Sequence, residues 1–405
     1  METSIRKPVV ASLCLMMFFQ YIMFAVWWVP LAAYLAQLDV SRSLSALILS
    51  SIAFGSFVSP MVGNLADKYF RGQHLLAFSN AIVAVMLLLS GFTQNPVLLF
   101  ITLLIAMLFY MPSWAITSAI ALRHVSPDIF PRIRVFGTVG WILAGVFSLV
   151  SLQFFQVDFD GTRLPFFFGA GLAAVGALLN LTLPDTPPMG KGTKSSFIDI
   201  MGFRSLVLLK DKNYAIFLAI FFLAMIPFSM YWSYFSEYLL SSGYRLITVT
   251  MSLGQVLEIF ILLTVPFSIK KIGLRNTMII GIVALIVRYV SLYLAGNEAQ
   301  IGFVLFGVMV HGIIFGYYHI GAQIYTDKVA PMHLKSQAQG LLFFVTFAMG
   351  LLVGNFVSGW IISLFSEQTA LGIEYNWNQI WGITSIMSIA ILICFLLFFR
   401  KDKPV

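Results

Sequence analysis

Long apolar stretches recur along the whole chain and are separated by short polar segments. A helix needs about 20 predominantly apolar residues to cross the hydrocarbon core of a bilayer. Twelve stretches meet this requirement, so the pattern predicts an all-α integral membrane protein with twelve transmembrane helices. Their approximate limits are 8–36, 44–66, 74–93, 97–122, 130–156, 165–184, 213–236, 247–269, 276–296, 300–326, 335–364 and 378–399.

The composition supports this class and excludes others. Hydrophobic residues make up 60% of the chain and charged residues 10%, against about 45–50% and 25% in soluble domains. A large soluble domain, a disordered chain and a nucleic-acid-binding protein are therefore excluded. Cys14 and Cys394 lie in apolar stretches without metal-ligand spacing, and we expect neither a metal nor a cofactor.

The basic residues predict the orientation in the membrane. Twelve spans put both termini on one side, and 20 of the 24 Lys and Arg fall on that side. Only Arg42, Arg163 and Arg245 fall on the other side, and Arg288 lies within a span. Because cytoplasmic loops are enriched in Lys and Arg, both termini are expected in the cytoplasm. The net charge of +8 then reflects orientation, not an anionic partner.

A polar, proline-containing segment divides the spans six and six. The sequence predicts an N-terminal half over 1–184, a cytoplasmic linker over 185–212 and a C-terminal half over 213–405. We also expect a surface helix near 197–208 in the linker. The halves share weak similarity at an offset of 203, where Gly137 matches Gly340. Two parallel six-span halves are typical of transporters whose substrate site lies near the membrane midplane.

Glu258 is the deepest carboxylate that the pattern places in a span, and Gln255 lies on the same helical face. Ionisable groups within a bilayer are costly and are usually functional. Glu258 is therefore the candidate for proton coupling and for hydrogen bonds to a hydroxylated substrate. The alternative is a structural glutamate paired with another helix through Arg288.

Two other spans carry candidate site residues. In the fifth span, Arg134, Thr138 and Trp141 share one helical face and offer donors and a flat ring on which a base can stack. The alternative for Arg134 is an anchor at the cytoplasmic end of its helix.

In the tenth span, His311, Phe315 and Tyr318 are expected on one face, with His319 beside them. A histidine titrates near neutral pH, so His319 is a second candidate for proton coupling. Packing with a satisfied hydrogen bond is the alternative for both histidines.

The loop after the second span contains Asp67, Lys68 and Arg71. It resembles the loop motif of the major facilitator superfamily, in which a glycine is followed four residues later by Asp and a basic residue. The later glycine of that motif is Phe70 here. These three charged residues are predicted to latch one conformation, and a solvated loop is the alternative.

Five segments resemble the nucleoside–proton symporter family within that superfamily, in family order and spacing. They are 110–113, 130–141, 183–188, 251–258 and 336–340. The resemblance implies the major facilitator fold and proton-driven nucleoside uptake across a bacterial inner membrane. It also implies that Gln255, Glu258, Arg134 and Thr138 belong to the substrate site, with Trp141 at a position that is aromatic in the family.

The chain departs from the family pattern in three places. Gly316 stands where the family has an Asp implicated in proton coupling. Ser229 and Trp232 replace two amides, and Ser118 replaces an Asn. Fewer amides mean fewer hydrogen bonds to a base.

We therefore predict a monomeric secondary transporter of nucleosides and protons that works by alternating access. A carrier of a sugar or another small polar metabolite in the same fold is one alternative, and a non-transporting membrane sensor is another. A membrane enzyme is not expected, because no metal cluster, nucleophile–base pairing or phosphate loop is found.

Overall fold

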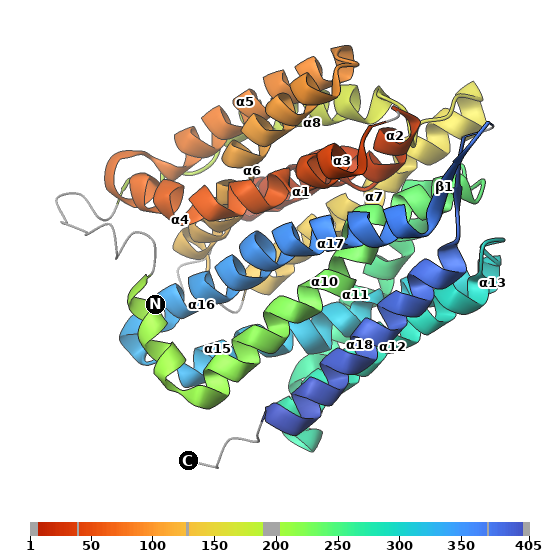
Figure 1. Cartoon of the computed structure of the whole chain (residues 1–405). Helices are drawn as coiled ribbons and strands as arrows, with labels where there is room; N and C mark the ends of the chain where they lie inside the picture. Colours follow the sequence, from red (N-terminus) through yellow and green to blue (C-terminus); the bar gives the residue numbers. More distant parts are fainter. Residues whose placement is uncertain (1–6, 39, 127–128, 189–202, 371, 400–405) are drawn as a thin grey trace. The chain divides into compact units, whose positions relative to one another are not determined.

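The computed structural model describes residues 7–38, 40–126, 129–188, 203–370 and 372–399, without the side chains of residues 63–68, 333 and 336. The described residues are helical almost throughout (Figure 1). The predicted surface helix near 197–208 falls partly outside them, and residues 203–210 form a 3-10 helix.

In chain order, the first helices are α1 (Lys7–Trp28), α2 (Leu31–Gln37), α3 (Arg42–Leu49), α4 (Ser51–Tyr69), α5 (Gly72–Phe92), α6 (Pro96–His124), α7 (Phe130–Phe155) and α8 (Leu164–Asn180). There follow η1 (Phe203–Lys210), α10 (Lys212–Ser241), α11 (Ile247–Ile272), α12 (Leu274–Ala295), α13 (Ile301–Met309), α14 (His311–Ile313), η2 (Ile314–His319), α15 (Ile320–Val329), η3 (Met332–Leu334), α16 (Lys335–Phe343), η4 (Phe344–Gly350), α17 (Leu351–Leu364) and α18 (Trp377–Phe398).

Within the described residues, 11 helical stretches are long and apolar enough to cross a membrane. A twelfth apolar helix, α8, has 17 residues, which is about the shortest length that spans a bilayer. The twelve predicted helices are thus present within a few residues of their expected limits. The predicted all-α membrane fold is confirmed.

Local chemistry interrupts several of these helices. Pro30 lacks a backbone N–H and separates α1 from α2. The tenth and eleventh predicted helices each contain a π-helical segment, η2 and η4 respectively. Because π-helical turns are rare and frequently mark functional sites, these two segments make this part of the chain a candidate functional region.

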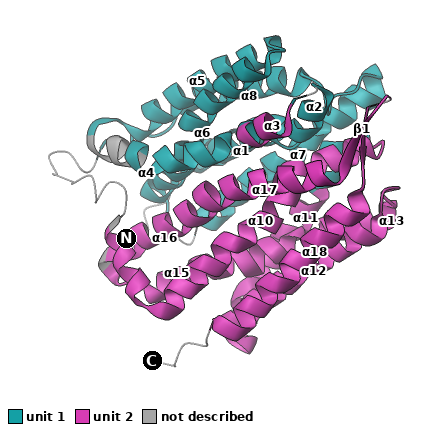
Figure 2. Ribbon diagram, in the orientation of Figure 1, with its two compact units in different colours: residues 1–40, 48–201, 245–252 teal, residues 41–47, 202–244, 253–405 magenta. Residues whose placement is uncertain are grey.

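The chain divides into two compact units (Figure 2). Unit 1 comprises residues 1–40, 48–201 and 245–252, and unit 2 comprises 41–47, 202–244 and 253–405. Each unit therefore includes a short segment from the other half of the sequence. Unit 1 includes the start of α11, and unit 2 includes the start of α3. The predicted division at a cytoplasmic linker over 185–212 stays our proposal.

Unit 1 is built around α1, which packs against α7 and α8. Helix α5 packs against α6 and α8, and α4 packs against α6. A buried amide cluster joins three of these helices: Gln20 donates to Ser113 Oγ at 2.5 Å and accepts from Asn80 at 3.2 Å. These bonds satisfy polar groups that are only 1% exposed or less, which apolar surroundings require.

In unit 2, α10 packs against α17 and α18, and α12 packs against α13, η2 and α18. Their facing side chains form an apolar core in which aromatic rings dominate. Its buried members include Tyr214, Phe217, Phe221, Tyr318, Tyr325 and Phe395.

A short hairpin, which the sequence pattern did not predict, follows α17. Strands β1 (Ser366–Thr369) and β2 (Gly372–Tyr375) pair antiparallel, with Ser366 opposite Tyr375. Arg42, at the start of α3 and within unit 2, donates to Tyr375 at 3.1 Å and to Glu237 of α10 at 2.5 Å. This cation thereby ties α3, α10 and the hairpin together.

In unit 1, a buried carboxylate holds the start of α11. Asp160, in the α7–α8 loop, accepts from Ser148 Oγ at 2.7 Å, from Thr248 Oγ1 at 2.6 Å and from the Thr248 N–H at 2.9 Å. The first N–H groups of a helix lack intrahelical partners and favour a negative charge. Burial raises the pKa of the Asp160 carboxyl, although these hydrogen bonds oppose that shift.

Replacing Asp160 by Ala is expected to destabilise the protein by about 3 kcal/mol, because three buried donors lose their partner. The neighbouring Asp158 provides a matched control: its pair with Arg245 has both side chains 55% exposed, and exposed pairs contribute about 0–1 kcal/mol. Thermal unfolding in detergent measures both variants. Equal effects of Asp158→Ala and Asp160→Ala would contradict the structural role of Asp160.

Candidate substrate and proton site

Two glycines bring α11 into close contact with the tenth predicted helix in unit 2. A Cβ atom at Gly312 would lie 2.7 Å from the Glu258 Cα, and one at Gly254 would lie 2.9 Å from the His311 Cβ. Real Cβ atoms do not approach so closely, so only glycine fits at either position. The sequence thus places Glu258 and His311 on backbones that nearly touch.

Glu258 faces His311 at this contact. The Glu258 Oε2 lies 3.7 Å from the His311 Nε2, and the two residues are 8% and 2% exposed. The other ring nitrogen of His311, Nδ1, has no hydrogen-bond partner among the described residues. Gln255 lies one helical turn before Glu258 and is half-buried.

Arg288 does not provide the hydrogen bonds to Glu258 that the structural alternative required. Its Nε donates to the Gly307 carbonyl at 3.1 Å, and its guanidinium lies 3.8 Å from the centre of the Tyr231 ring. Both Nη atoms lack a hydrogen-bond partner within the described part of the chain. Arg288 is fully buried, and it interacts with aromatic and backbone groups.

The tenth helix presents a row of rings. His311 stacks near Phe315 with centroids 6.2 Å apart, and Phe315 lies 5.7 Å from His319. Tyr318 differs from its predicted placement beside His311 and Phe315. Its ring stacks on Phe221 of α10 at 4.1 Å, within the aromatic core of unit 2.

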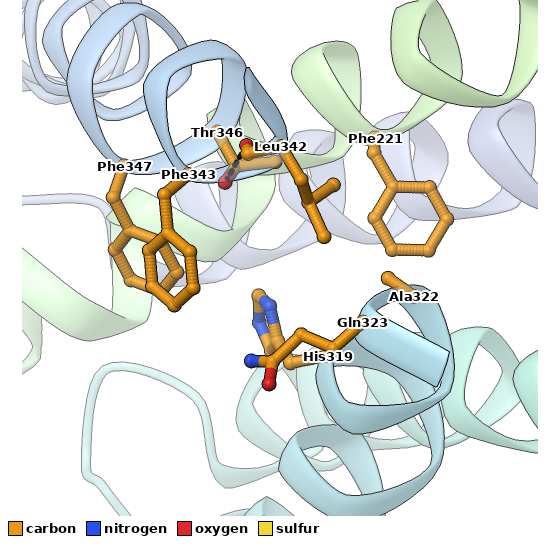
Figure 3. A pocket seen from close by; sticks show the side chains of 8 residues that line it. All are labelled: Phe221, His319, Ala322, Gln323, Leu342, Phe343, Thr346 and Phe347. Atoms are coloured by element: carbon orange, nitrogen blue, oxygen red, sulfur yellow. Dashed lines mark hydrogen bonds between the residues drawn. The ribbon is translucent and has the colours of Figure 1, made fainter. Parts of the chain in front are cut away.

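His319 borders a small recess in unit 2 (Figure 3). The recess is lined by side chains from α10, α15, α16 and both π-helical segments. The polar groups that line it are His319, Gln323 and Thr346, and the rings of Phe343 and Phe347 stand beside them. The His319 Nε2 has no hydrogen-bond partner in the described structure.

In unit 1, the predicted residues of the fifth helix follow the side of α7 that faces α1. The Arg134 guanidinium lies 4.2 Å from the centre of the Tyr21 ring, and Trp141 meets Phe24 with centroids 5.7 Å apart. Thr138, which lies between Arg134 and Trp141 in the sequence, is half-buried. Arg134 therefore has an aromatic partner on α1, and this arrangement differs from an anchor exposed at a helix end.

Of the predicted latch residues, Arg71 is described, and the side chains of Asp67 and Lys68 lie outside the described residues. Arg71 donates to Asp185 at 3.1 Å, and Gln73 donates to the same carboxylate at 2.8 Å. The Gly72 N–H also donates to the Thr186 carbonyl. These bonds fasten the segment after α8 to the start of α5.

The site in unit 2 includes residues that the sequence analysis did not select. Tyr231 stands between Arg288 and His311, whose ring it meets at 5.9 Å and 27°. An aromatic residue in a span is ordinarily a packing residue, so its type alone does not reveal this position. The available signal is one glycine in each helix, Gly254 and Gly312, which permits the close helix contact but does not predict the residues behind it.

The buried ionisable pair and the apolar helices define a multi-pass membrane carrier, and the comparisons specify which kind. A family model described as "Nucleoside H+ symporter" matches residues 8–404. The chain therefore belongs to the nucleoside–H+ symporter family, a class of proton-coupled nucleoside uptake transporters with the major facilitator fold.

Individual relatives agree with this assignment. The putative nucleoside transporter YegT of Escherichia coli (strain K12) is 33% identical over 401 residues, which cover 97% of this chain and 94% of the relative. The nucleoside permease NupG of the same organism is 26% identical, with 96% and 95% covered. A crystal structure of a NupG variant superposes with a TM-score of 0.87 at 25% identity, covering 97% of this chain and 100% of that one.

The close helix contact is testable through its glycines. Gly312→Ala would force a methyl group against the Glu258 backbone, and overpacking costs about 1–3 kcal/mol. We expect lower thermal stability and a loss of nucleoside uptake. Gly302→Ala is the control, because a Cβ at Gly302 of α13 would meet nothing within 4 Å. If both variants behave alike, the close approach does not position Glu258.

Proposed function

We propose that Glu258 couples proton movement to nucleoside uptake by alternating access. The observation that carries this proposal is the burial of Glu258 against His311 in the middle of a membrane-spanning helix. Protonation of a buried carboxylate removes a charge from a low-dielectric interior. The protonated and deprotonated carriers therefore differ in their conformational preference, and a ligand that binds one state better shifts the equilibrium toward it.

The substrate contacts in this proposal come from the residues that the family resemblance implies. Gln255 and Glu258 would bind the ribose hydroxyls, because a carboxylate and an amide together accept and donate hydrogen bonds. Arg134 and Thr138 would donate to the base, and Trp141 would offer it an apolar face. Phe315 would provide a second aromatic surface beside His311.

The range of accepted nucleosides follows from the family amides that this chain lacks. Ser229 stands at one of these positions, and its hydroxyl donates to the Ile226 carbonyl and bonds Ser358 at 2.9 Å. A side chain engaged within the helix bundle does not recognise a base. We therefore propose that the carrier forms hydrogen bonds with fewer groups on the base. For the same reason, a sugar or another small polar metabolite is the second candidate substrate.

The remaining assignments complete the proposal. The carrier works as a monomer in a bacterial inner membrane with both termini in the cytoplasm, as the distribution of Lys and Arg favours. It binds no nucleic acid and catalyses no chemical reaction on its substrate. Asp67, Lys68 and Arg71 act as the conformational latch, for which the bonds of Arg71 to Asp185 provide support.

Labelled uridine, adenosine and xanthosine in parallel uptake assays, with and without a protonophore, test the proposed function. We expect accumulation of at least one nucleoside that the protonophore abolishes. Competition by unlabelled nucleosides and monosaccharides separates the two substrate candidates. Failure to take up any nucleoside would exclude the nucleoside carrier and leave the metabolite carrier and the non-transporting sensor.

Glu258→Gln is expected to abolish accumulation against a gradient while counterflow exchange continues. The amide cannot take up the proton, but it keeps the size and the hydrogen-bonding capacity of the side chain. Glu298→Gln, at an exposed loop position, serves as the control and should accumulate like the unmodified protein. Accumulation by Glu258→Gln with an unchanged pH dependence would exclude Glu258 as the coupling group.

Arg134→Lys tests the contribution of the guanidinium. Lysine keeps the charge but loses the planar group that stacks on Tyr21, and a cation–π contact contributes about 1 kcal/mol. The apparent KM for nucleoside should rise roughly 5-fold. Arg132→Lys, at an exposed position two residues closer to the helix start, is the control. Similar KM values for both variants would argue against a binding role for Arg134.

A further inference from the structure

We propose that the Glu258–His311 pair carries the coupling proton as one unit and that Arg288 is a fixed cation that limits the pair to a single proton. This inference rests on the proposed proton-coupled uptake. It assigns to His311 the role that the sequence analysis gave to His319, and it assigns to Arg288 a role as a positioning residue.

The two side chains of the pair are close enough to share one proton. A proton that enters from water can bind the Glu258 carboxylate or the His311 ring, because the facing atoms Oε2 and Nε2 lie 3.7 Å apart. Either placement gives one added charge shared between the same two side chains, and groups coupled in this way titrate together. The glycine contacts at Gly254 and Gly312 hold the two backbones at that distance.

Arg288 places a fixed positive charge in the same unit as the pair. It is fully buried, and its two Nη atoms have no hydrogen-bond partner among the described residues. An unpaired cation in the hydrocarbon region is costly and is usually retained for function. Arg288 and ionised Glu258 together carry no net charge, so binding one proton leaves a net charge of +1 and a second would raise it further.

Tyr231 links the cation to the pair. Its ring lies under the Arg288 guanidinium at 3.8 Å and meets the His311 ring at 5.9 Å. A protonated His311 and Arg288 therefore stand on the same aromatic side chain and repel each other. This repulsion opposes full protonation of both Glu258 and His311.

The other titratable groups around His311 offer no competing acid. His319 of η2 is separated from it by Phe315 and has no carboxylate within 4 Å in the described chain. Tyr289 of α12 donates to the Pro227 carbonyl, and Tyr317 of η2 bonds Thr264. Helix α13 contains no titratable residue.

Gly316 explains why the proton site differs from the family pattern. A Cβ at this position would point toward apolar atoms, with Ile261 Cγ2 at 3.1 Å and Val265 Cγ2 at 3.5 Å. A carboxylate at position 316 would therefore face hydrocarbon. The proton-binding role of the family's Asp must then lie at another position in this chain. His311, five residues earlier and facing Glu258, provides a titratable group instead.

The pH dependence of nucleoside accumulation in proteoliposomes tests the proposal, with labelled uridine, adenosine and xanthosine as the probes. His311→Gln removes a base from the pair, so the midpoint of the pH profile should move down by about one unit. Arg288→Gln removes a repelling cation, so the midpoint should move up by about one unit. His319→Gln and the exposed His74→Gln should keep the original midpoint.

Counterflow exchange verifies that each variant is folded, and His311→Asn replaces His311→Gln if that variant does not exchange. The proposal is overturned if His319→Gln shifts the midpoint and His311→Gln does not, or if the His311 and Arg288 variants move it in the same direction. A direct measurement on the unmodified protein is independent of any variant: the flux ratio should be one proton per nucleoside, and a ratio of two would contradict the role of Arg288. Absence of proton-driven accumulation in the unmodified protein would instead refute the proposed function itself.

Discussion

The free-energy cost of a charge in the hydrocarbon core is the constraint on which this structure depends. Nearly all of the charged residues lie in loops or at helix ends, so the few ionisable groups inside the bundle require a physical reason. Glu258 has His311 at 3.7 Å, and Arg288 has the Tyr231 ring and one backbone carbonyl. Buried charges are tolerated when other groups compensate them.

Close helix packing makes this arrangement possible. In a bilayer, helices gain little from the hydrophobic effect between them, and small residues allow their backbones to approach. Gly254 and Gly312 provide that approach for α11 and the tenth helix. The π-helical turn η2 begins three residues after His311, where the helix departs from regular geometry. Glycine packing and helix distortion thus meet at the residues to which we assign proton coupling.

The sequence predicts much of the fold, because twenty-residue apolar stretches have few structural solutions in a membrane. The helix limits and the burial of Glu258 follow from that pattern, whereas the family follows from the resemblance of five sequence segments. The breaks beside Pro30 and Ser50, the π-helical turns and the β1–β2 hairpin do not, because they depend on local geometry that hydrophobicity does not encode. The pairing of Glu258 with His311 and of Asp160 with Thr248 joins residues 53 and 88 positions apart. Spacing within one helix cannot predict such partners.

The central claim is that nucleoside and proton cross the membrane together through Glu258. Proteoliposomes that contain the protein and an internal pH-sensitive dye test it most directly, when uridine, adenosine or xanthosine is added outside without an imposed gradient. The account predicts that nucleoside entry acidifies the interior, and that Glu258→Gln abolishes the acidification but not exchange. Nucleoside entry with no change in internal pH would contradict it.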